Sequence, residues 1–320
     1  MPVNLDRPQA WKADVAQSVD AYNSWFMEFA PQAFRDTRIQ TTRDVEVALG
    51  QTRHMTDIDA QTIRQYPTIL PTLRMATCPP LAVDRLIGLA GVNPNLVKTM
   101  EKEKKTPRNM SESDLMWQLG QIGAVIQRMV DPDIFVWLSR DEPAGQIEIH
   151  RAATIVADRL CGAVANPIIR NAQEKRQLLA IKRWLEARDY RQIQIADGTR
   201  FNTMPTGTFS FRMNVPVKQG DGVRMVNIPI DAVIMPKSAR EGDLPILIEA
   251  KSAGDFTNTN KRRKEEAVKM TQLCATYGDK TRFYLFLCGY FDTGYLGYEA
   301  AEGIDWVWEH RIDDLALFGI

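Results

Sequence analysis

The chain has 320 residues, which is long enough for two domains or for one large domain with an insertion. It contains 40 basic and 40 acidic residues, and its content of 44% hydrophobic and 25% charged residues is ordinary for a water-soluble globular protein. A net charge of zero argues mildly against a generally basic DNA-binding surface, but it leaves room for a local basic cleft beside acidic groups.

The sequence shows no sign of secretion or of membrane insertion. Residues 1–15 lack the apolar core of a signal peptide, and the longest apolar run, residues 283–291, is too short to span a bilayer. The four cysteines are far apart and include no CxxC pair, so we expect reduced thiols rather than a zinc site or a disulfide framework. These features predict a cytoplasmic protein with no membrane partner.

The first half of the chain has a helical pattern. Trp11, Val15, Val19, Tyr22 and Phe26 recur at helical spacing and predict one amphipathic helix. Further helices are expected, in chain order, at residues 42–50, 81–90, 111–129, 147–164 and 167–187, the last two separated by Asn166-Pro167. The charged segment 98–109 has two interpretations: a solvated loop or fraying helix end, and a loop that faces DNA.

From about residue 190 the pattern changes to that of strands. Alternating runs at residues 192–195, 208–217, 225–235 and 244–250 predict strands, and the nearly continuous apolar run 282–290 predicts a strand buried on both faces. A helix is expected between them at residues 260–277. We therefore predict an α+β fold: a mainly helical region at residues 1–150, for DNA recognition and dimerisation, and a catalytic domain at residues 151–320 built on a mixed sheet flanked by helices.

Two of these apolar runs flank the polar segment 237–243 and predict a β-hairpin. Period-two alternation places Glu249 and Lys251 on one face of the second strand, while Ile246 and Ile248 lie on the other. The first strand carries Asp231. Because uncompensated buried charge is costly, two acids and a lysine on neighbouring strands favour a site where a divalent metal compensates the acids.

Such a set of residues suits hydrolysis of a phosphodiester. Asp231 and Glu249, with the backbone carbonyl of Ala250, are hard oxygen ligands of the kind that Mg²⁺ prefers, and a held Mg²⁺ activates water and acts as a Lewis acid. Lys251 is expected to orient the attacking water and to stabilise developing negative charge. An acid followed by x-Lys is common in proteins, so the pattern alone is equally compatible with an exposed hairpin that carries a surface ion pair.

Glu174 is a candidate third acid. It extends the apolar stripe formed by Leu178, Ile181 and Leu185 on the predicted helix. A carboxylate in this place either lies solvated near the start of the helix, where it is favourable to the helix dipole, or points toward a charged group. In the second case it acts on the metal directly or through water.

A cluster of cations marks the predicted start of the helix at residues 260–277. Asn260 is followed at once by Lys261, Arg262, Arg263 and Lys264. Four cations in a first helical turn oppose the helix dipole, so helix stability does not explain them. Contact with DNA phosphates explains them better, because backbone amides and cationic side chains converge on an anion there. The alternative is a solvated face in which the next two glutamates pair with the cations.

The hairpin residues Pro229-x-Asp231 and Glu249-Ala250-Lys251, preceded by a helix that carries Glu174, resemble the PD-(D/E)XK nuclease core. The chain as a whole is similar to the XamI family of type II restriction endonucleases. The segments that carry this similarity are residues 21–31, 69–75, 84–89, 253–262 and 303–311.

The resemblance implies Mg²⁺-dependent double-strand cleavage of DNA at a short palindrome, which is GTCGAC for the namesake of the family. It also implies a companion DNA methyltransferase that protects the host, and the symmetry of a palindrome implies a two-fold homodimer. Asp231, Glu249 and Lys251 carry over directly from the motif. Glu174 carries over through its place on the preceding helix, where the acids of this class vary in position.

Two alternatives to a site-specific endonuclease remain open from the sequence. The same core serves in DNA repair nucleases and junction resolvases, against which the large helical region favours sequence reading. A non-catalytic DNA-binding protein that keeps the fold is the other alternative, and the complete set of Asp231, Glu249 and Lys251 argues against it.

Overall fold

The computed structural model describes residues 2–194, 200–219, 224–257 and 259–320, and it leaves the side chains of residues 259–263 undescribed. Its contacts divide the chain into a sheet unit, Met1–Phe29 with Arg170–Ile320, and a helical unit, Ala30–Ile169. The sequence predicted a single division near residue 150. The division differs because two long helices, α1 (Pro8–Gln51) and α7 (Gln146–Glu186), each contribute to both units.

Both long helices contain a proline at which the sequence predicted a break or a gap. Pro31 lies inside α1, which joins the expected helices near residues 11–26 and 42–50. Pro167 lies inside α7, so the expectation of two helices separated at Asn166-Pro167 is wrong. A proline removes one backbone donor and bends a helix, but packing on both sides can keep the helix continuous. Each proline lies within three residues of the division between the units.

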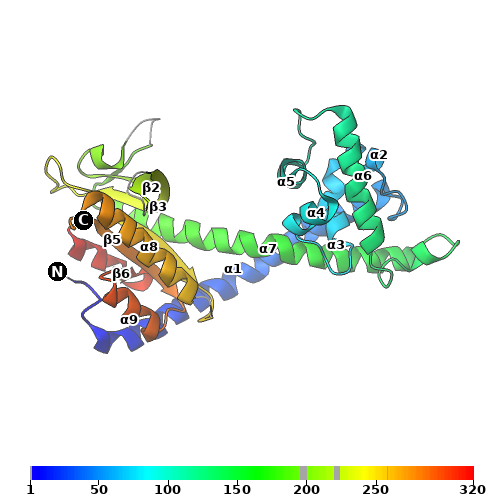
Figure 1. Ribbon diagram of the computed structural model, residues 1–320. Coiled ribbons are helices and arrows are strands. Elements are labelled where there is room, and N and C mark those ends of the chain that lie inside the picture. Colours follow the sequence, from blue (N-terminus) through cyan, green and yellow to red (C-terminus); the bar gives the residue numbers. More distant parts are fainter. Residues whose placement is uncertain (1, 195–199, 220–223, 258) are drawn as a thin grey trace. The chain divides into compact units, whose positions relative to one another are not determined.

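The helical unit contains five short helices besides its parts of α1 and α7 (Figure 1). They are α2 (Ala60–Gln65), α3 (Leu70–Met75), α4 (Val83–Ala90), α5 (Pro94–Glu103) and α6 (Glu112–Met129), with 3-10 turns at Pro67–Ile69 and Val136–Ser139. Helix α6 matches the helix predicted at residues 111–129, and the Ser111 side chain caps it by accepting the Asp114 backbone N–H at 3.2 Å. Segment 98–109 forms the end of α5 and the loop after it, as its structural interpretation expected.

The part of α7 in the helical unit is apolar for a structural reason. One 18-residue window of this helix is apolar enough to cross a membrane by length and composition, with a mean hydropathy of 1.3, but 44% of the window is buried inside the structure. Ala152, Val156 and Leu160 pack in the same core as Leu119 and Ile122 of α6. A buried core helix passes this test without a membrane, so α7 is weak support for a membrane location.

Within the described residues, the sheet unit contains six strands arranged in chain order, some of which are labelled in Figure 1. They are β1 (Arg191–Gln192), β2 (Thr208–Lys218), β3 (Met225–Met235), β4 (Ile246–Ala253), β5 (Arg282–Gly289) and β6 (Asp305–Trp308). The β2–β3 and β3–β4 pairs are antiparallel, and the β1–β2, β4–β5 and β5–β6 pairs are parallel. Helices α8 (Thr259–Tyr277) and α9 (Thr293–Ala301) connect the last three strands. The predicted α+β class with a mixed sheet is confirmed.

The two faces of the sheet pack into separate cores. The α7-side core contains Ile181 and Leu185 of α7 with Ile246 and Ile248 of β4. The α8-side core contains Leu273 of α8 with residues of the opposite face, such as Leu247 and Leu285. The face assignment predicted for β4 is therefore confirmed, and it directs Glu249 and Lys251 to the side covered by α8. The four cysteines are free, as expected.

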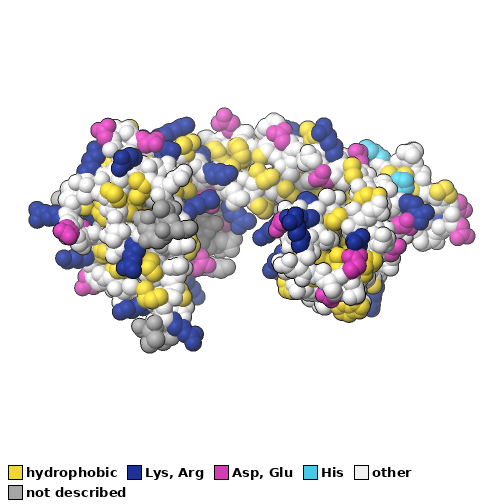
Figure 2. Space-filling view, turned by 90° about the horizontal axis from the view of Figure 1, so that it is seen from above, with side chains coloured by type: hydrophobic (Ala, Val, Ile, Leu, Met, Phe, Trp, Pro, Cys, Tyr) yellow, Lys and Arg dark blue, Asp and Glu magenta, His cyan; other side chains and the backbone are white. Residues whose placement is uncertain are grey.

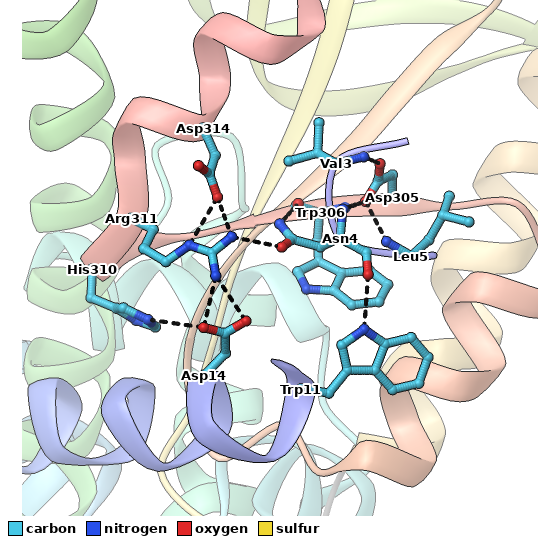
Figure 3. A network of polar contacts seen from close by, with 10 residues as sticks. All are labelled: Val3, Asn4, Leu5, Trp11, Asp14, Asp305, Trp306, His310, Arg311 and Asp314. Atoms are coloured by element: carbon cyan, nitrogen blue, oxygen red, sulfur yellow. Dashed lines mark hydrogen bonds and ion pairs between the residues drawn. The ribbon is translucent and has the colours of Figure 1, made fainter. Parts of the chain in front are cut away.

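The N-terminal segment is tied to the end of the sheet by a buried carboxylate (Figure 3). Asp305, at the start of β6, accepts the backbone N–H groups of Val3, Asn4 and Leu5. The Trp11 indole donates to the Asn4 carbonyl at 2.8 Å, which joins α1 to the same network. Asp305 is 3% exposed, so water offers the three amides little replacement for this acceptor.

We expect Asp305→Ala to lower the free energy of unfolding by about 3 kcal/mol, because it leaves three backbone donors, two of them in buried residues, without their charged acceptor. Chemical denaturation followed by tryptophan fluorescence measures this change. Asp6→Ala is the matched control, since Asp6 lies in the same segment but is exposed, and we expect a change within about 0.5 kcal/mol. Equal losses in the two variants would contradict the role assigned to Asp305.

Candidate active site

The structure brings Asp231, Glu249 and Lys251 together at the point where β3 and β4 stop pairing. Backbone pairing of these strands ends at Ala232 with Ile248. Beyond it the Asp231 carboxylate accepts the Ala250 backbone N–H at 2.9 Å, in place of a strand–strand bond. Lys251 Nζ lies 3.0 Å from Glu249 Oε1. The hairpin therefore holds two acids and a lysine where its strands separate.

Electrostatics at this point favour a bound cation. Burial raises the pKa of Asp231 to about 6, and the Glu249 carboxylate adds to this rise. Hydrogen bonding from the Ala250 N–H and the charge of Lys251 act in the opposite direction, and Glu174 adds a smaller rise. A positive ion beside Asp231 would offset both main causes.

Lys251 is an ammonium at neutral pH. Burial disfavours its charge, but the Glu249 and Glu266 carboxylates outweigh burial and raise the pKa of Lys251. A protonated lysine donates hydrogen bonds and stabilises negative charge, so the general-base role is disfavoured.

Helix α8 adds two residues that the sequence did not single out as part of the site. Lys269 Nζ lies 2.7 Å from Glu249 Oε1, the oxygen that also contacts Lys251. Glu266 is fully buried, with Oε1 3.6 Å from Lys251 Nζ and with Oε2 accepting the Tyr295 hydroxyl at 2.7 Å. Their spacing places both residues on one face of a helix, but the many Lys and Glu residues around them obscure which face meets the sheet.

The oxygen atoms of this site fit a hard divalent ion. Glu249 is 5% exposed, and its Oε2 atom is buried without a hydrogen-bond partner among the residues that the structure describes. An unpartnered buried carboxylate oxygen is costly, and a cation would satisfy it. Mg²⁺ commonly binds one or two carboxylates and fills its remaining positions with water, which Asp231 and Glu249 can provide for.

Glu174 does not form a ready-made third ligand. Across the described parts of the chain, no three His, Cys, Asp or Glu side chains are arranged to hold a metal. The Glu174 carboxylate instead accepts a hydrogen bond from the Arg212 guanidinium at 2.6 Å. The interpretation in which Glu174 points toward a charged group thus has a definite partner, which is an arginine.

The predicted phosphate-binding residues are only partly visible. Helix α8 begins at Thr259, close to the predicted start. The side chains of Asn260, Lys261, Arg262 and Arg263 lie outside the described residues, and Lys264 is exposed. On the face shown in Figure 2, Lys and Arg side chains are interspersed with Asp and Glu rather than gathered in one patch.

A mixed sheet with two acids and a lysine at the opening of its central hairpin is consistent with a restriction-endonuclease-like core, and this is the class to which the comparisons with known proteins point. A sequence model of the XamI restriction endonuclease family matches residues 53–308, and the chain belongs to this family. The type II restriction enzyme SalI of Streptomyces albus G is 54% identical over 317 residues, which cover 99% of each chain. No solved structure matches the chain.

Proposed function

We propose that this protein is a type II restriction endonuclease of the PD-(D/E)XK superfamily that makes Mg²⁺-dependent double-strand cuts in DNA at a short palindrome. The observation that carries the proposal is the buried Glu249 Oε2 atom without a partner, beside Asp231, in a member of a restriction endonuclease family. The relative SalI, named as a type II restriction enzyme, supports it along the full length of the chain. For the palindrome we propose GTCGAC.

Asp231, Glu249 and the carbonyl of Ala250 would hold the Mg²⁺, which supplies Lewis-acid chemistry and an activated water when bound. The Lys251 ammonium orients the attacking water and stabilises charge that develops on the phosphate. Lys269 adds a second positive charge at the same carboxylate, which it shares with Lys251. Asn260, Lys261, Arg262, Arg263 and Lys264 bind phosphates at the start of α8.

The partners in this proposal follow from the substrate. A palindrome is read most simply by a two-fold homodimer, with one catalytic site for each strand. The helical unit supplies contacts for sequence reading. The enzyme acts on DNA in the cytoplasm, and a companion methyltransferase protects the host's own sites.

The test is cleavage of a plasmid that carries a single GTCGAC sequence. With Mg²⁺ we expect one linear product, and with EDTA no product. A plasmid in which one base pair of the sequence is changed is the matched control and should stay intact. Discrete products from both plasmids would mean that the enzyme recognises a sequence other than GTCGAC. Smearing or selective junction cutting would favour the repair-nuclease alternative. Intact DNA in every reaction would contradict the nuclease proposal.

A further inference from the structure

Arg212 has an unusual backbone conformation in the middle of β2. Its φ is +53°, in the left-handed region that residues other than glycine rarely adopt. Strands β2 and β3 pair in one register on both sides of this residue, from Thr208 with Met235 to Lys218 with Met225. In that register Arg212 stands opposite Asp231, and this position is missing from the ladder.

At the level of Arg212, the side chains of β2 and β3 change from one face of the sheet to the other. Before it, Phe209 and Phe211 pack with the α7-side core, whereas after it Met213 and Val215 pack with the α8-side core. A regular strand with a period of two would keep all four side chains on one face. Strand β3 switches at the same level, since Ala232 lies in the α7-side core and Ile230 lies in the α8-side core.

This change of face lets the part of the β2–β3 pair beyond Arg212 pack on α8. The Lys218 backbone N–H donates to the Thr276 hydroxyl at 2.9 Å, and the Tyr277 hydroxyl donates to the Pro216 carbonyl. The fold therefore uses the left-handed backbone at position 212. It does not need an arginine there, because glycine adopts this conformation without steric cost.

The contacts of the Arg212 side chain contribute too little to the stability of the fold to explain why an arginine occupies this position. Its ion pair with Glu174 is exposed, with 58% of the arginine side chain and 35% of the glutamate side chain open to solvent. Exposed ion pairs contribute little to folding, and less than a left-handed residue other than glycine costs. A strained residue next to a catalytic group points to a functional use of its side chain.

We propose that Arg212 binds the phosphate backbone of DNA at the cleavage site, and that Glu174 holds the guanidinium in place before DNA binds. This inference rests on the proposed nuclease function. The position opposite Asp231 places the arginine on the strand next to the acids, and the planar guanidinium is suited to a bidentate contact with phosphate. In DNA binding, phosphate oxygens would replace the Glu174 carboxylate as acceptors.

Arg212→Gly tests the proposal, because it relieves the backbone while it removes the guanidinium. We expect an unfolding midpoint equal to or above that of the wild type. With DNA saturated by enzyme, we expect single-turnover cleavage with Mg²⁺ to slow by at least about tenfold. In binding assays with Ca²⁺, the observed association constant Kobs should depend less on salt, and the magnitude of the slope of log Kobs against log salt concentration should decrease by about one. Arg212→Lys should keep the salt slope but not the full cleavage rate.

Arg240→Gly is the matched control. Arg240 is also an exposed arginine of the sheet unit, but it lies in the loop between β3 and β4 and not opposite Asp231. This variant should keep both the cleavage rate and the salt slope of the wild type.

Each contrary result has a distinct meaning. If wild-type protein does not cut DNA, the proposed function fails. If wild type cuts and Arg212→Gly matches it in rate and salt slope, the role of Arg212 is overturned. A lower unfolding midpoint for Arg212→Gly than for wild type would overturn the strain argument on which the inference depends.

Discussion

Asp231→Asn is expected to abolish DNA cleavage and, in metal-free protein at neutral pH, to make the fold more stable. Asparagine keeps an oxygen for the Ala250 N–H but loses the negative charge that a divalent ion requires. We therefore expect single-turnover cleavage to fall by at least about 1000-fold, the scale at which single electrostatic groups act in active sites.

The gain in stability follows from the direction of the Asp231 pKa shift. Burial and Glu249 raise its pKa from 3.8 to about 6, so the folded protein holds a proton more tightly than the unfolded chain does. Wild-type stability therefore falls as the pH rises from about 4 to about 6, and it stays lowered above that. The asparagine variant lacks this penalty and should exceed wild type by about 2 kcal/mol at pH 8.

Urea denaturation in EDTA at pH 8 and at pH 4 measures this difference, which should be largest at pH 8 and small at pH 4. The exposed Asp279→Asn is the matched control and should change neither stability nor cleavage. Added Mg²⁺ should stabilise wild type more than the Asp231 variant, because binding to the folded state alone raises its stability. Cleavage by Asp231→Asn at the wild-type rate would show that the site is assigned wrongly.

Lys251→Met is expected to remove cleavage as completely as Asp231→Asn does, and also to destabilise the protein. Lys251 is the cation that lies between two buried acids, at 3.0 Å from Glu249 and 3.6 Å from Glu266. Removing one partner of a buried ion pair leaves the other charge uncompensated, so we expect a loss of about 3 kcal/mol. Glu249 keeps Lys269 as a partner, whereas Glu266 keeps the neutral Tyr295 hydroxyl and a hydrogen bond with the Glu299 side chain but no cation among the described contacts.

A second substitution separates stability from catalysis. Adding Glu266→Gln to Lys251→Met removes the uncompensated charge while an amide can still accept from Tyr295. The double variant should regain at least half of the lost stability, and its cleavage should remain as low as that of Lys251→Met alone. Glu265→Gln, which changes an exposed neighbour on α8, is the control and should restore no stability.

These results are read from denaturation curves together with binding in Ca²⁺ and cleavage in Mg²⁺. DNA binding by the double variant should stay close to wild type, since the change concerns the chemical step. A double variant that regains cleavage along with stability would mean that Lys251 serves the fold and not the reaction.

The local pattern of residues predicts the bounds of several strands and helices and the face of β4 that carries the site residues. Period-two alternation in the hairpin predicted that Glu249 and Lys251 share a face, away from Ile246 and Ile248, and the structure places them so. The strand at residues 225–235 and the start of α8 were predicted within a residue. These features depend on side-chain periodicity and on capping, which short stretches of sequence carry.

Tertiary packing decided the features that depend on contacts between distant segments. Pro31 and Pro167 stay inside helices, although each proline removes one hydrogen bond, and the helix segments before and after each proline belong to different units. The sequence does not predict which side of α8 faces the sheet, because a helix rich in charged residues has no apolar stripe to mark its buried side. Only the fold brings Glu266 and Lys269 of α8 to the catalytic hairpin, and only the fold places a left-handed Arg212 opposite Asp231.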